Sequence, residues 1–130
     1  MKSNSIESSI IRILTAELKS ICPNVFFGKS QVIYPKINAD LRTIGDETPQ
    51  QIRYRLTLDY YSNDSTPITA VTMSEDVRSA LSDGMIYDES GALITTRKTS
   101  GGGFVEEKDS EKVVHYMDAY ELDYYKNRDF

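Results

Sequence analysis

The segment from Gln51 to Tyr61 constrains the fold most, because its side chains alternate between apolar and polar. One side of this segment carries Ile52, Tyr54, Leu56, Leu58 and Tyr60, and the other carries Arg53, Arg55, Thr57 and Asp59. A period of two is typical of a β-strand with one covered face. At ~3.3 Å per residue the strand would be about 35 Å long, and such strands build antiparallel sheets covered on one side.

Two helices are predicted to supply that cover. From Ser5 to Ile21 the apolar side chains recur at helical spacing, and Pro23 ends the pattern because proline cannot continue the hydrogen-bond ladder. The stripe consists of Ile6, Ile10, Ile13, Leu14, Leu18 and Ile21. A second helix is predicted from Pro67 to about Ser82, with Ile68, Val71, Val77, Ala80 and Leu81 facing inward.

The remaining segments with alternating or apolar side chains are predicted to be strands. They run from Val25 to Phe27, from Lys36 to Ile44, from Leu93 to Thr99 and from Lys112 to about Tyr125. The resulting order, α-β-β-β-α-β-β, predicts one α+β domain over residues 1–130. We expect a mostly antiparallel sheet of about four to five strands with two helices packed on one face.

The last predicted strand carries apolar side chains on both of its faces. One face has Val114, Tyr116, Tyr120 and Leu122, and the other has Val113, Met117 and Ala119. A strand that is apolar on both faces is covered on both. Since two helices cover only one face, the second cover would come from another subunit, and Met117 and Tyr120 are candidate interface residues.

A loop is predicted from Ser100 to Ser110, because Gly101, Gly102 and Gly103 follow one another there. Three consecutive glycines lose much conformational entropy when they become ordered, so we expect this loop to be mobile. The apolar pair Phe104 and Val105 at its middle is a candidate anchor for an adjacent subunit or a tube end. The alternative is a solvated hairpin loop without a partner.

No complete catalytic or metal-binding arrangement is evident. His115 is the only histidine and Cys22 the only cysteine, and neither lies in a recognisable nucleophile setting. The three glycines are followed by a predicted strand, whereas a phosphate-binding loop needs a helix and usually a lysine. We therefore expect no catalytic residue, cofactor site or metal site, and a protein that is not an enzyme.

The chain is acidic, with a net charge of −5 and a sequence pI near 4.9, and it lacks a cluster of basic residues. This argues against binding to phosphates or to an anionic membrane surface, but not against DNA passing nearby. No apolar run reaches the ~18–20 residues of a membrane span. With Cys22 as the only cysteine there is no intramolecular disulfide, so the cytoplasm is the expected compartment. Glu7 and Arg12 interrupt what would be the apolar part of a signal peptide.

The order of segments resembles the tail terminator (tail-completion) proteins of long-tailed phages over nearly the whole chain. The similar stretches are an N-terminal helix, Pro23 to Gly28, Tyr34 to Ile37, Arg53 to Tyr61, and His115 to Leu122. The resemblance is a pattern of elements without a catalytic motif, and the segment from Ser100 to Ser110 is longer than that pattern suggests.

The resemblance implies a structural role in the virion tail, with assembly in the cytoplasm of the bacterial host. Such proteins form a ring, commonly a homohexamer, on the head-proximal end of the tail tube. The ring stops tube polymerisation and joins the tail to the head connector, while DNA passes through the lumen. Two alternatives are a head–tail connector or stopper protein, and a cytoplasmic α+β module that binds ligands or peptides at a sheet edge.

Overall fold

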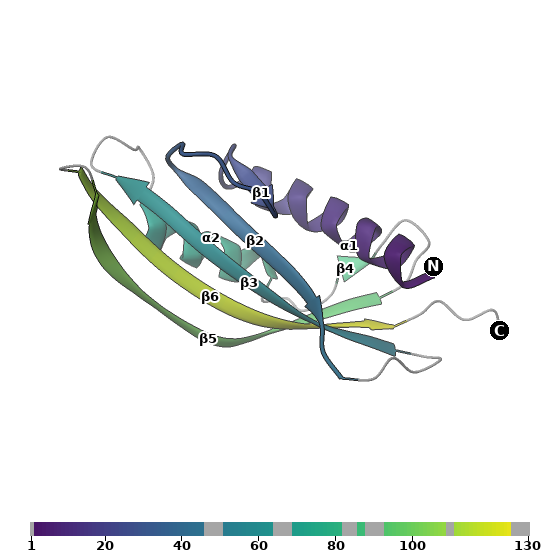
Figure 1. Cartoon of the computed structure of the whole chain (residues 1–130). Helices are drawn as coiled ribbons and strands as arrows, with labels where there is room; N and C mark the ends of the chain where they lie inside the picture. Colours follow the sequence, from purple (N-terminus) through teal and green to yellow (C-terminus); the bar gives the residue numbers. More distant parts are fainter. Residues whose placement is uncertain are drawn as a thin grey trace.

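A computed structural model describes residues 2–45, 51–63, 69–81, 86–87, 93–108 and 111–125. Its elements, in chain order, are α1 (Lys2–Lys19), β1 (Val25–Phe27), β2 (Lys36–Thr43), β3 (Gln51–Asn63), α2 (Ala70–Leu81), β4 (Ile86–Tyr87), β5 (Leu93–Lys108) and β6 (Glu111–Tyr125). The fold is α+β, with two helices on one side of a long twisted sheet (Figure 1). The predicted fold class is confirmed.

The described strands form one sheet in the order β1-β2-β3-β6-β5-β4. The β1 and β2 strands run parallel, and every other neighbouring pair is antiparallel. The two-residue strand β4 was not predicted. The centre of the sheet is β3, which pairs with β2 on one side and along its whole length with β6 on the other.

The core lies between the sheet and the two helices, and the alternation of β3 decides which side faces it. Every even-numbered side chain of β3 is buried, as the sequence pattern predicts: Ile52, Tyr54, Leu56, Leu58, Tyr60 and Ser62. The helices add Ile10, Leu14, Leu18, Met73, Val77 and Leu81 to the same cluster. Burying these apolar side chains on one face is what fixes the register of the long strands. Val71 and Ala80, predicted to face inward, are instead exposed.

The helix ends follow from local capping. After α1, the backbone N–H groups of Ile21 and Cys22 donate to the Leu18 carbonyl at 3.0 and 2.9 Å, and Pro23 prevents a further turn. At the start of α2, the Thr69 hydroxyl accepts from the Thr72 N–H at 3.1 Å, which makes Thr69 the N-cap. Within the described residues α2 therefore begins at Ala70, and the predicted start at Pro67 lies outside them.

The predicted loop from Ser100 to Ser110 is wrong over its first nine residues, because β5 continues to Lys108. Gly101, Gly102 and Gly103 pair in register with Asp118, Met117 and Tyr116 of β6. Two of the glycines are required by close packing against β6. A Cβ on Gly101 would lie 2.5 Å from Asp118 Oδ1, and one on Gly103 would overlap the Tyr116 ring. These glycines therefore give side chains of β6 room to lie across β5.

Candidate interaction face of the sheet

No described helix covers the sheet surface opposite α1 and α2, and we call it the open face, although Lys36 and Val113 on it are buried. It presents the odd-numbered side chains of β3 and β6, the even-numbered ones of β2 and the matching positions of β5. Register places Arg42, Arg55, Glu121 and Arg97 side by side on four adjacent strands. This transverse row carries three guanidinium groups and one carboxylate.

The acidic side chains of the open face are held by basic ones. Arg53 Nε donates to Asp123 Oδ1 at 2.9 Å, Arg42 Nε donates to Asp40 Oδ2 at 2.7 Å, and Arg97 is paired with Glu121. The hydrogen bond and charge of Asp123 raise the pKa of the Arg53 guanidinium. These pairs are exposed, so each contributes little to stability, but together they fix the charge pattern that a partner would meet.

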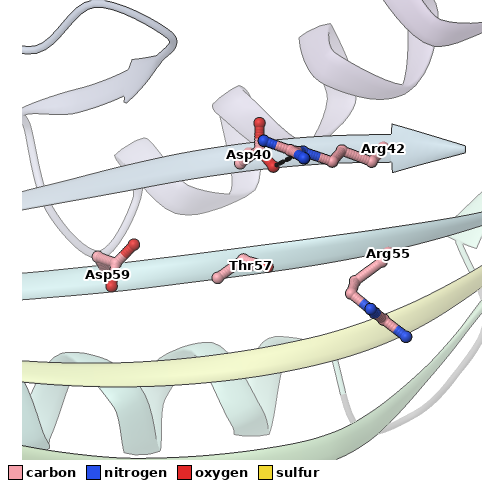
Figure 2. A pocket seen from close by; sticks show the side chains of 5 residues that line it. All are labelled: Asp40, Arg42, Arg55, Thr57 and Asp59. Carbon is pink, nitrogen blue, oxygen red and sulfur yellow. Dashed lines mark hydrogen bonds and ion pairs between the residues drawn. The ribbon is translucent and has the colours of Figure 1, made fainter.

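Arg55 is the exception in this pattern. Among the residues that the structure describes it has no ion-pair partner, because Asp40 is held by Arg42 and Glu121 by Arg97. Arg55 lines an open pocket of about 430 Å³. The pocket is lined by Asp40, Arg42, Arg55, Thr57 and Asp59. Figure 2 shows the Arg55 side chain directed away from the joined Asp40 and Arg42 side chains.

His115 lies on the open face beside β3. Its Nε2 is 2.8 Å from Asp59 Oδ1, and its ring stacks on Tyr61 with centroids 4.3 Å apart. The Lys36 ammonium lies 4.9 Å from the centroid of the Tyr61 ring, within range of a cation–π interaction. The side chain is therefore placed to contact whatever binds the open face. Its neighbours Asp59 and Tyr61 could be found only from the β3–β6 register.

Of the two interface residues predicted on the last strand, the structure leaves one accessible. Met117 lies on the open face with 41% of its surface exposed. Tyr120 is only 1% exposed and belongs to the core cluster on the helix side. The prediction for Tyr120 is therefore wrong, because the two residues have opposite parity along β6 and face opposite sides of the sheet.

The other two predicted interface residues lie in β5. The backbones of Phe104 and Val105 pair with His115 and Val114 of β6, so this segment is part of the sheet. Their side chains lie outside the described residues. Residues 109 and 110 of the predicted loop are also outside them.

A polar cluster that the sequence did not predict is buried on the helix side of β6. Asp118 is 0% exposed, accepts a hydrogen bond from the Ser74 hydroxyl of α2 at 2.5 Å, and lies 3.2 Å from Lys98 Nζ of β5. Burial, followed by the nearby Asp118 charge, raises the pKa of Tyr60 and raises that of Tyr120 to about 12. The available signal was Asp118 itself, a carboxylate among even-numbered apolar positions of β6.

The single cysteine belongs to the core. Cys22 is fully buried in the core cluster, and its burial raises the pKa of the thiol. His115 lies on the opposite side of the sheet. Within the described ranges no group of three or more His, Cys, Asp or Glu side chains could hold a metal ion.

The described helices are too short or too polar to cross a membrane. No protein-family model matches the chain, and no curated protein is significantly similar to it. Solved structures do match, among them one that is 13% identical with a TM-score of 0.58 and covers 100% of this chain and 99% of its own. The name of that protein states no function, so the similarity supports the fold alone.

Proposed function

We propose that this chain is a structural assembly protein that caps the head-proximal end of a phage or prophage tail tube as a ring. The observation that carries the proposal is the open face, a broad sheet surface with ordered charge pairs and exposed Met117 that the chain's own helices do not cover. The order of elements that resembles tail terminators supports it. The role is structural and includes no catalytic step.

The proposed partners follow from that role. They are further copies of this chain in a ring, sixfold by analogy with the resembling family, the tail tube protein below it and the head connector above it. DNA would pass through the lumen, where an acidic protein does not retain a polyanion. The protein would be assembled in the host cytoplasm and end in the virion tail.

A module that binds peptides at a sheet edge is an alternative of a different class. Peptide binding by strand addition needs an accessible edge several residues long. The described outer strands are β1, with three residues, and β4, with two. However, β4 pairs only with Leu93 and Ile94, so the rest of β5 forms a long edge within the described chain, and strand addition at that edge is the second candidate function.

Electron microscopy of tails assembled without this protein tests the proposal. Tubes of uncontrolled length that regain a defined length when the purified protein is added would support tube capping. Tails of normal length that lack heads would instead favour the connector or stopper role. Tails of normal length with heads attached would rule out both.

A further inference from the structure

The charges of the open face are unbalanced at one point. Asp40, Asp123 and Glu121 are each held by an arginine, and Asp59 is held by His115. Arg55 carries the guanidinium on this face without a described acidic partner, and the residue lines the open pocket of Figure 2. A guanidinium in this position can bind a carboxylate through two parallel hydrogen bonds.

The outward side of α2 carries the complementary feature. Glu75 and Asp76 are exposed there, and neither has an ion-pair partner within the described chain. Val71, one helical turn before Glu75, is 43% exposed, so the two side chains share one side of the helix. This side of α2 therefore offers carboxylates beside an apolar side chain, which suits a surface that carries Arg55 and Met117.

We propose that the occupant of the open face is α2 of a second copy of this chain, with Glu75 or Asp76 bound by Arg55. The inference rests on the proposed ring and identifies the surfaces that build it. The two surfaces lie on opposite sides of the molecule, because α2 packs on the far face of the sheet (Figure 1). Each contact therefore leaves one open face and one α2 unused, and head-to-tail contacts of this kind continue until a ring closes.

The open face is large enough for such a contact. At ~3.3 Å per residue and ~4.8 Å between strands, β2, β3, β6 and β5 span an outline on the order of 800 Å². The 12-residue α2 is ~18 Å long and fits within this outline, and adjoining surface of the second copy would complete the ~800 Å² that each partner of a stable interface buries. The exposed ion pairs around Arg55 would form the polar part of the interface.

Charge reversal tests the contact with the full-length protein. Sedimentation velocity and a tube-capping assay are applied to Arg55→Glu, to the milder Arg55→Gln, and to the double variant Glu75→Arg with Asp76→Arg. The matched control is Glu17→Arg, a reversal at an exposed position of α1. We expect the Arg55 and α2 variants to weaken self-association by about tenfold or more and the control to leave it unchanged.

Mixing makes the test specific. In an equimolar mixture of Arg55→Glu with the α2 double variant, every head-to-tail contact pairs opposite charges, so we expect assembly to return. If Arg55→Glu associates as strongly as the wild type, or if association does not recover in the mixture, this contact is refuted while the proposed ring is not. Loss of tube capping without loss of self-association would indicate that the open face binds the tube protein instead. A wild-type chain that neither associates nor caps tubes would refute the proposed function itself.

Discussion

Replacing Gly101 by alanine is expected to destabilise the protein through one defined contact. The new methyl carbon would lie 2.5 Å from Asp118 Oδ1 and 3.1 Å from Cε and Nζ of Lys98. Asp118 cannot easily retreat, because it is fully buried and held by the Ser74 hydroxyl at 2.5 Å. The substitution therefore forces apart the buried pair of Asp118 and Lys98.

The size of the effect follows from three contributions. Breaking a buried ion pair costs ~3–5 kcal/mol, but the Lys98 side chain is 28% exposed and can move toward water, which favours the lower end. Overpacking adds ~1 kcal/mol or more. Replacing a strand glycine by alanine returns ~0.5–1 kcal/mol by restricting the unfolded chain. We expect a net loss of roughly 3 kcal/mol in the free energy of unfolding.

Urea unfolding followed by far-ultraviolet circular dichroism measures this loss as a midpoint lowered by about 1 M or more. The matched control is Gly102→Ala, because a Cβ at that position meets nothing within 4 Å. We expect the control to be neutral or slightly stabilising. If the two alanine variants unfold within ~0.5 kcal/mol of each other, the reasoning from the Asp118 contact is refuted.

Three further predictions use the core and the open face. Tyr120→Asp should lower the free energy of unfolding in urea by more than ~3 kcal/mol, because it places a carboxylate in the core. Met117→Asp should have a free energy of unfolding within ~1 kcal/mol of wild type but should associate more weakly in sedimentation. Equal stability of the two variants would contradict the finding that these residues lie on opposite sides of the sheet. Cys22→Ser and added chelator should leave tube capping intact even if the buried serine lowers stability, and loss of capping on chelation would reveal a metal. In a tyrosinate absorbance titration, Tyr60 and Tyr120 should stay protonated above pH 10, because burial raises the pKa of both and raises that of Tyr120 to about 12. The stability linked to Tyr120 is then fully present below about pH 10 and is lost as pH rises through 12. Uniform titration of all nine tyrosines near pH 10 in the folded protein would contradict this prediction.

The elements that could be predicted from the sequence are those whose apolar residues follow a single helical or strand period throughout. The stripe of α1 and the alternation of β3 each bury one side of their element, and the structure places Leu14 and Leu56 where those periods put them. The open face follows from the same alternation, which assigned Arg53 and Arg55 to its polar side. What the alternation could not supply is the lateral register, so the pairing of Asp59 with His115 was not predictable.

Tyr120 shows a different limit of sequence patterns. A tyrosine on a strand suits both a core and an interface, because its ring packs while its hydroxyl can stay polar. Even-numbered residues of β6 face the helices, and that assignment depends on knowing that Leu122 and Tyr120 lie beneath the helix layer. The apolar residues on the other side of β6 are interspersed with Glu121 and Asp123, and that side is the open face.

The second half of β5 was predicted as a loop because a β-bulge interrupts the alternation of this strand. Before the bulge, Lys98 pairs with Tyr120 on the helix side, and after it Ser100 pairs with Ala119 on the open side. The inward positions of β5 therefore change from even to odd, and Gly101 comes to lie next to Lys98 over the buried Asp118. A strand whose period shifts at a bulge and then continues in glycines has no alternation to detect. The same glycines that suggest a flexible loop in the sequence are, in the sheet, the positions where any larger residue would displace the buried carboxylate.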